Sequence, residues 1–373
     1  MKNEKRLKQE NREAITLVAL VITIIVLLIL AGITISLTIG QNGIITRAQE
    51  AGKNYLNAQD QELAGLNHFD KTVENILENI KNDSVGSAVS LPTEITTQKT
   101  IAVDDKGNIV VVPEGFKVVT SEATTVDKGI VIEDASGNQF VWIPVGEIIK
   151  ADGTKETIGF NRYTFAEDGT PTGQNDANLA WYKELATSSY GNTVAKDIAR
   201  FKTSAVENKG YYVGRYEART ATKRTAKEDA LTQITSKKAD YVYNFVTQPQ
   251  AAEQARGMYN KSTFTSDLMN SYAWDTALVF IQKCGENANY SNQNSLNTEF
   301  AEKGTDSDKQ CNVYDVASNI KEWTTETYDR SDSPCVSRGS KYNRSSDTPS
   351  NRNTHSATTY SNEENGFRAI LYL

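Results

Sequence analysis

A long uncharged run near the N-terminus dominates the hydropathy pattern of this 373-residue chain. Residues 15–39 carry no charged side chain, and residues 1–14 ahead of them include five lysines and arginines. A helix of this length extends about 37 Å, more than the roughly 30 Å of a hydrocarbon core. The run is too long for the apolar part of a signal peptide, so we expect a retained membrane span. The basic head predicts a cytoplasmic N-terminus and an extracellular remainder.

A second helical pattern follows the apolar run. Apolar residues recur at helical spacing through residues 45–80, with charged and amide residues between them. This spacing predicts an amphipathic stalk helix that continues outward from the membrane. Its apolar stripe needs a partner, which is either the chain's own globular domain or a neighbouring subunit.

Residues 81–100 have the composition of a linker, and residues 101–373 alternate between strand and helix patterns. Turn sequences such as DDKGN and DASGN bound the short apolar runs, which is typical of strands. Helical spacing of alanines and large apolar residues marks the helices. The expected strands are 99–103, 108–112, 116–120, 129–133, 139–145, 211–216 and 366–373, and the expected helices are 194–206, 248–258 and 271–282. This mixture places the domain in the α+β class.

The most unusual composition lies in residues 338–365, where 17 of 28 residues are Ser, Thr, Asn or Tyr. Such composition usually indicates disorder. Here ordered-looking apolar sequence encloses it on both sides, which predicts a polar loop held on a packed scaffold. These residue types are favoured in adaptable binding loops, and the tyrosines at 342 and 360 are the expected main anchors. The candidate ligand-binding residues are Tyr342, Asn343, Ser345, Ser346, Asp347, Asn351, Asn353, His355, Thr358, Tyr360 and Asn362.

Three motifs in a fixed order resemble the formylglycine-generating-enzyme (sulfatase-modifying-factor) type of the C-type lectin fold. They are NVYDVASNIKEWT at 312–324, VSRGSKY at 336–342 and GFR at 366–368, with weaker likeness in GYYVGRYEAR and NQFVWIPVG upstream. The resemblance implies a lectin-like fold for residues 101–373. Ser318 stands where the family has glycine, and no cysteine follows residue 338. The reactive cysteine pair of the enzymes is therefore missing, and we expect no catalytic residues.

The polar segment also resembles the variable proteins of diversity-generating retroelements, which use this fold to bind ligands. In those proteins adenine mutagenesis of Asn-type codons yields Asn, Ser, Thr, Tyr, Asp, His and Gly just before a GFR-type end. Residues 340–362 have this mixture, with Arg338, Pro349 and Arg352 as candidate fixed points. An ordinary polar loop closing a lectin-like domain is the alternative, and both interpretations give a binding module.

The N-terminus resembles type IV pilin-like proteins, in which a short basic leader precedes a sequence similar to ITLIALVITIIVLLILAG. The resemblance implies cleavage between Ala14 and Ile15 and self-assembly through the N-terminal helix. Ala14 replaces the glycine of the leader, and Ala19 stands where glutamate is common. A plain uncleaved membrane anchor is therefore the alternative.

The net charge and the small number of reactive side chains argue against several other classes of function. A net charge of −7 argues against a nucleic-acid surface, which needs a basic patch. The only histidines are His68 and His355, too few for an imidazole metal site or a Ser-His-acid triad to be argued. Asp and Asn residues in 287–294 and 305–309 offer oxygen ligands to a structural calcium ion, but turns favour the same residues.

The three cysteines, Cys284, Cys311 and Cys335, do not form a disulfide framework or a thiolate zinc site. One bridge between Cys311 and Cys335 and three free thiols are both open. We thus expect a membrane-anchored or pilus-displayed protein that binds an extracellular protein or glycan, without catalysis or a required cofactor. A relative of the formylglycine-generating enzymes and a structural pilin subunit are the alternative functions.

Overall fold

The computed structural model describes residues 90–173, 179–356 and 359–373. The expected leader, membrane span and stalk helix, residues 1–80, lie outside the described residues. Within the described ranges no helix is long and apolar enough to cross a membrane. The chain divides into two compact units, Met1–Ser84 and Val85–Leu373, and every described residue belongs to the second.

The described end of the expected linker packs on the domain. Ser90 forms a bridge with Val103, and Leu91 is buried. The amide of Thr96 donates a hydrogen bond to the carbonyl of Phe116 at 2.9 Å. These contacts hold residues 90–99 against the first strands.

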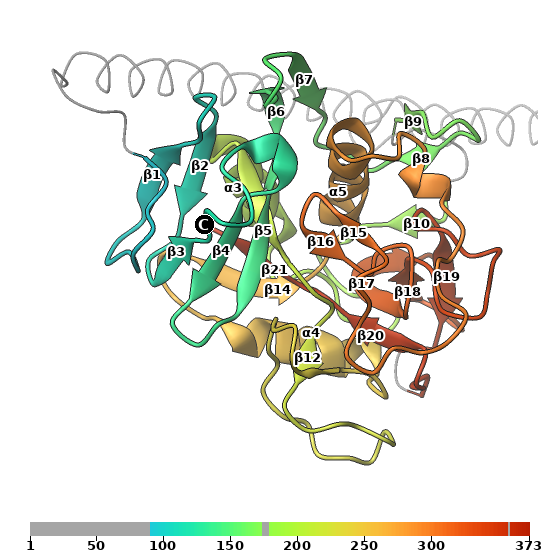
Figure 1. The fold of residues 1–373 in the computed structure, drawn as a ribbon. Helices are drawn as coiled ribbons and strands as arrows, with labels where there is room; N and C mark the ends of the chain where they lie inside the picture. The colour runs from blue at the N-terminus through green and yellow to red at the C-terminus, as the bar shows by residue number, and fades with distance from the viewer. Residues whose placement is uncertain (1–89, 174–178, 357–358) are drawn as a thin grey trace, which may run out of the picture. The chain divides into compact units, whose positions relative to one another are not determined.

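The larger sheet has six strands in the order β14-β21-β11-β5-β4-β3, and all neighbours in it are antiparallel (Figure 1). Its strands are β3 (Phe116–Val118), β4 (Val131–Asp134), β5 (Gln139–Pro144), β11 (Gly210–Gly214), β14 (Thr265–Leu268) and β21 (Ala369–Tyr372). The strands expected between 99 and 145 and at 211–216 are confirmed, with ends shifted by one or two residues. Short apolar runs between turn residues are a strong local signal, which explains this agreement.

Among the described residues, three α-helices pack around the sheets: α3 (Ile198–Glu207), α4 (Gln248–Met258) and α5 (Ser271–Cys284). The expected helix 248–258 has the same bounds as α4, because a capping box between Thr247 and Gln250 fixes its start. By contrast α3 begins at Ile198 instead of residue 194. The Asp197 side chain accepts a hydrogen bond from the Arg200 amide and caps the helix there.

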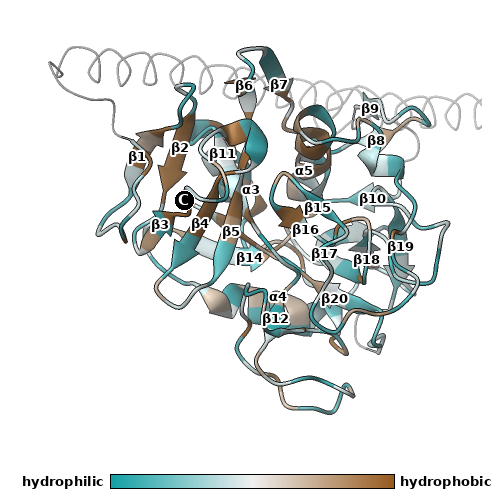
Figure 2. Ribbon diagram, viewed as in Figure 1, coloured by the Kyte–Doolittle hydropathy of each residue, from teal (hydrophilic) through white to brown (hydrophobic). Residues whose placement is uncertain are grey.

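The smaller sheet has the order β10-β17-β18-β19, with β20 pairing parallel to β17. Its strands are β10 (Tyr182–Lys183), β17 (Lys321–Tyr328), β18 (Cys335–Arg338), β19 (Arg352–His355) and β20 (Asn365–Phe367). Figure 2 shows that this sheet is largely hydrophilic, whereas β2 is hydrophobic along its length. All of β17 except Tyr328 is nevertheless buried. Buried polar side chains need partners, and these partners define the site described below.

The remaining elements are short. They are the hairpins β1 (Thr100–Val103) with β2 (Ile109–Val112), β6 (Gly146–Ile149) with β7 (Lys155–Ile158), β8 (Thr164–Phe165) with β9 (Pro171–Thr172), β12 (Arg219–Thr220) with β13 (Tyr241–Val242), and β15 (Lys309–Gln310) with β16 (Val313–Tyr314), together with the 3-10 turns Val126–Lys128 and Tyr290–Asn292.

The C-terminal segment corrects one expectation. Residues 366–373 were expected to form one strand, but β20 and β21 belong to different sheets. Arg368 lies between them and is fully buried. Its guanidinium makes a 2.7 Å ion pair with Glu322 of β17 and donates to the carbonyl of Gly214 of β11 at 2.7 Å. The segment therefore changes sheet at Arg368 and ties the two sheets together.

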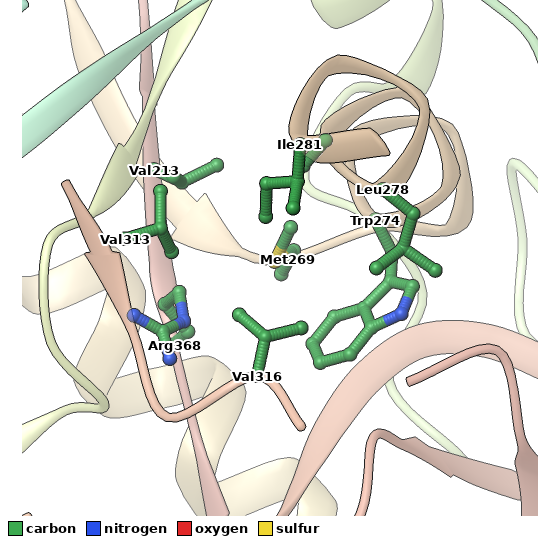
Figure 3. A pocket seen from close by; sticks show the side chains of 9 residues that line it. Val213, Met269, Trp274, Leu278, Ile281, Val313, Val316 and Arg368 are labelled. Atoms are coloured by element: carbon green, nitrogen blue, oxygen red, sulfur yellow. The ribbon is translucent and has the colours of Figure 1, made fainter. Parts of the chain in front are cut away.

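The apolar core extends between α5 and the segment after Cys311. Figure 3 shows Trp274 and Leu278 of α5 facing Val313 and Val316, with Arg368 at one side. All of these side chains are buried. The small gap between them is closed by apolar groups and forms part of the core. This packing holds α5 in the core next to the smaller sheet.

Candidate ligand-binding site

Two arginines at the base of the polar segment point into the domain. Arg338 ends β18 and Arg352 begins β19, and the two residues are cross-strand partners. Asp275 of α5 lies between them, with one carboxylate oxygen 2.6 Å from Arg338 and the other 2.7 Å from Arg352. Like charges on paired positions repel, so the shared carboxylate is what allows both arginines to be buried here.

Glu326 of β17 is the second acid in this cluster. It lies 3.2 Å from Arg338, 3.0 Å from Arg352 and 2.6 Å from Arg162. Burial alone would raise the pKa of Glu326, but Arg352, Arg338 and Arg162 together lower it to about 2. Glu326 is therefore ionised over the whole physiological range. Together with Asp275, it holds Arg352 at the start of β19.

A third point holds the middle of the segment. Pro349 is buried, and its carbonyl accepts a 2.8 Å hydrogen bond from the indole of Trp274. Nearby, the Ser340 hydroxyl donates to the carbonyl of Asp347 at 2.8 Å. The expected fixed points Arg338, Pro349 and Arg352 thus all contact the interior. All three contacts involve residues of α5, since Trp274 and Asp275 lie side by side on it.

Between these points the chain turns outward. Asn343, Ser345 and Ser346 are exposed, as is Arg344. Asn343 has φ 57°, in the left-handed region that asparagine tolerates better than most residues. Its amide donates to the carbonyl of Asn297 at 3.1 Å, so the backbone is held while the side chains face solvent.

The edge strand β19 and the following turn carry half-buried candidates. The rings of His355 and Tyr360 stack with centroids 4.0 Å apart, and both contact the buried ring of Trp323 edge-on. A ring nitrogen of His355 lies 3.2 Å from the Ser337 hydroxyl. Burial and then the nearby Lys321 lower the pKa of His355 to about 4. The ring is therefore neutral at pH 7 and offers an aromatic surface. Asn353 is also half-buried on this strand.

Two further candidates hold the backbone of the segment. The Asn351 side chain accepts a hydrogen bond from the Thr348 hydroxyl at 3.0 Å. Asn362 accepts from the Glu364 amide at 3.1 Å and from the side chain of Asn365 at 2.7 Å. Both are half-buried, so their amides serve the turn geometry first.

Tyr342 and Asp347 do not belong to the exposed surface. The Tyr342 ring is only 8% exposed and packs against Phe300, while its hydroxyl donates to Glu363. Asp347 is 4% exposed and pairs with Lys321 at 2.9 Å. The Tyr342 ring, expected from the sequence as a main ligand anchor, thus fills an interior position and is not part of the exposed surface. Thr358 lies outside the described residues.

An aromatic group beside the site was not among the sequence candidates. The rings of Tyr182 of β10 and Tyr328 of β17 pack at a tilt with centroids 5.0 Å apart, and the Arg352 guanidinium lies over the Tyr182 ring at 5.8 Å. Trp181 is 57% exposed, the largest exposed fraction among the large hydrophobic residues described. In the sequence, the sign of this aromatic group is the adjacent pair Trp181 and Tyr182 in an otherwise polar stretch. Only the pairing of β10 with β17 brings it to this sheet.

The acidic residues considered for calcium make protein contacts. Asp308 accepts hydrogen bonds from Tyr290, the Ala317 amide and Ser318. Asp306 pairs with Lys238 at the surface. Among the residues that the structure describes, no three His, Cys, Asp or Glu side chains gather as a metal site.

Comparisons with known proteins add little. No family model matches the chain, and no curated protein matches it. Variable protein 1 of Treponema denticola aligns at 12% identity with a TM-score of 0.35, covering 69% of this chain and 99% of its own. PvdO from Pseudomonas aeruginosa aligns at 12% identity with a TM-score of 0.34, covering 65% of this chain and 98% of its own. Likenesses with such low TM-scores carry no argument about function.

Proposed function

We propose that residues 90–373 form a lectin-like binding module whose polar segment, 338–365, is a ligand-binding surface of variable sequence on a fixed frame. One observation carries this proposal. Within a single stretch of similar composition, Arg338, Pro349 and Arg352 are tied to the interior, whereas Asn343 to Ser346 face solvent. Variation at the exposed positions leaves the frame intact, which is what a diversified surface requires.

The chemistry of the exposed positions suits a protein or glycan ligand. Asn and Ser offer both donors and acceptors, and the stacked pair His355–Tyr360 supplies an aromatic face beside them. Aromatic side chains dominate binding hot spots, so Tyr360 replaces Tyr342 as the expected anchor. Trp181 and Tyr182 are candidates for the rim.

Sequencing the coding DNA of a growing population tests the diversification. We expect a nearby copy of the stretch for residues 338–365 that differs only at adenines, beside a reverse transcriptase gene. Substitutions should collect in the codons of Asn343, Ser345 and Asn353 and spare those of Arg338 and Arg352. Uniform substitution across these codons would show an ordinary polar loop.

Binding is tested with the purified protein on protein and glycan arrays. The triple variant N343A/S345A/S346A should lose the signals of the wild type. The matched control T222A/K227A/E228A changes three exposed residues of another loop and should keep them. Signals that persist in the first variant would place the binding surface elsewhere.

We also propose that the module is displayed outside the cell through residues 15–39, either as a single anchor or in a pilin-like filament. The uncharged run and its basic head support this proposal. Electron microscopy of sheared surface fractions distinguishes the two forms. Filaments that contain the chain support assembly, and recovery only in detergent supports a single anchor.

The alternative of a formylglycine-generating enzyme is tested with a sulfatase-motif peptide. Such chemistry needs a reactive thiolate. Burial raises the pKa of the Cys335 thiol to about 12, and that side chain is fully buried. We expect no conversion of the peptide by the purified protein. Conversion would overturn the proposal of a pure binding module.

A further inference from the structure

A hollow of about 350 Å³ lies where the C-terminus of α5 meets the turn between β15 and β16. Cys284, the last residue of α5, and Cys311, the first residue of that turn, both line it. Cys284 is buried and Cys311 is half-buried. A bridge between Cys311 and Cys335 is one of the two possibilities that the sequence leaves open, but the structure places Cys284, not Cys335, beside Cys311 at this hollow.

The two segments come close at the thiols. A β carbon placed on Gly285, which follows Cys284, would lie 3.6 Å from the Cys311 sulfur. The backbone amide of Glu286 donates a 3.4 Å hydrogen bond to the side-chain oxygen of Gln310, the residue that precedes Cys311. Burial is the main cause that raises the pKa of Cys311, and Cys284 comes next, ahead of the smaller contribution of Asp127. For Cys335 burial is the only cause of the raised pKa.

The turn that carries Cys311 is fixed before any bond forms. Cys311 and Asn312 have φ 44° and 64°, and the Asn312 side chain donates to the Gly129 carbonyl at 2.8 Å. A β carbon on Gly129 would lie 1.9 Å from the Cys311 carbonyl oxygen, so only glycine fits there. This contact fixes the backbone of Cys311 against Gly129.

We propose that Cys284 and Cys311 form a structural disulfide that ties the C-terminus of α5 to the β15–β16 turn. The bond forms by exchange with a small-molecule disulfide such as oxidised glutathione. One cysteine thiolate attacks the glutathione disulfide and releases a glutathione thiolate. The second cysteine thiolate then displaces the other glutathione. The two cysteines lose two protons and two electrons, and the oxidant becomes two thiols.

Burial of the thiols determines when the disulfide can form. Burial raises the pKa of Cys284 to about 12, so its thiolate is scarce in the folded protein. The bond is therefore made while the chain folds and is afterwards protected. It restrains α5, whose Asp275 holds Arg338 and Arg352. The proposal does not depend on the binding function.

Counting thiols tests the proposal. The full-length chain is refolded with oxidised and reduced glutathione, denatured, and titrated with a thiol reagent. We expect one free thiol per chain, and peptide mass mapping should join the peptides of Cys284 and Cys311. Three free thiols, a bridge to Cys335 or a bridge between two chains would each overturn the proposal.

Variants provide the matched controls. Cys335→Ala should keep the bridge and leave no free thiol, whereas Cys284→Ser should leave two. Reduction should lower the melting temperature of the wild type and of Cys335→Ala by about 5–10 °C. It should not change that of Cys284→Ser. If Cys284→Ser fails to fold, the thiol count and peptide map of Cys335→Ala decide alone. An unchanged melting temperature of Cys335→Ala on reduction would contradict a structural bond.

Discussion

Arginine side chains at 338 and 352 can be buried because two acids, on α5 and β17, neutralise them together. Burying a charge without a partner costs several kcal/mol, so each member of the cluster depends on the others. The cluster holds three arginines and two acids, with Arg162 as the third cation. The removal of one acid therefore leaves more than one charge unpaired.

The first prediction concerns Glu326→Gln. This change keeps the shape of the side chain but removes the charge that faces Arg162, Arg338 and Arg352. We expect a loss of about 3–5 kcal/mol in the free energy of unfolding, measured by chemical denaturation. Ser346→Ala, an exposed change in the same segment, should stay within about 0.5 kcal/mol. Equal stability of both variants would refute the role of the cluster.

A second prediction at this scale concerns pH. Burial lowers the pKa of His355 to about 4, below the ordinary value of 6.5. Between these values the unfolded chain binds a proton at this position and the native protein does not. The contribution of His355 to stability is therefore complete above pH 6.5 and is lost as pH falls towards 4.

Melting curves of the wild type and of His355→Asn at pH 7 and pH 4.5 test this sign. The wild type should lose more stability than the variant between the two pH values. Comparing the two proteins removes contributions from other groups, such as Glu184, whose pKa burial raises to about 7. A larger acid loss in the variant would contradict the prediction.

At the scale of elements, the polar segment contains two kinds of position that its composition does not separate. Asn343 and Ser345 are exposed. Tyr342, which precedes them in the sequence, is instead buried against Phe300. The same residue types serve both purposes. Only the contacts distinguish the surface from the frame.

This difference gives the third prediction, a substitution scan that measures melting and binding together. Tyr342→Ala should cost about 3 kcal/mol, because a buried aromatic ring is removed. Alanine at Ser345 should change the free energy of unfolding by less than about 0.5 kcal/mol and should weaken ligand binding. Alanine at Asn343 should also weaken binding, but it should cost about 1 kcal/mol because alanine tolerates a φ of 57° less well than asparagine. Trp323→Ala, at a fully buried position, should cost about 3–5 kcal/mol and serves as the reference. A destabilising change at Ser345, with unchanged binding of both variants, would indicate a structural loop.

For the whole molecule, the fourth prediction is topology. Residues 15–39 are expected to span the membrane, with the basic head inside and the module outside. Treatment of intact cells with protease should remove epitopes of residues 90–373, while a cytoplasmic marker protein stays intact. Protection of those epitopes in intact cells, with loss after permeabilisation, would reverse the orientation.

The local pattern of apolar and polar residues is sufficient to predict many of the strands and helices of the domain. Strands such as β5 and helices such as α4 follow from runs of apolar residues, turn glycines and caps, all of which act within a few residues. The short β17–β20 sheet was harder, because seven of the eight residues of β17 are buried although most are polar. Along β17 polar and apolar residues do not alternate, so the usual sequence signal of a strand is missing.

The remaining features depend on partners far away in the chain. Glu326 pairs with Arg162 across 164 residues, and Arg368 contacts Gly214 across 154. Contacts between distant parts of the chain bury Tyr342 and divide residues 366–373 between two sheets. They also bring Cys311 near Cys284, although Cys335 is closer to Cys311 in the sequence. Periodicity reports which side of an element is apolar. Whether a polar side chain faces solvent or a buried counter-charge is decided only when the sheets pack on α5, because the energy of burying it depends on the group it meets.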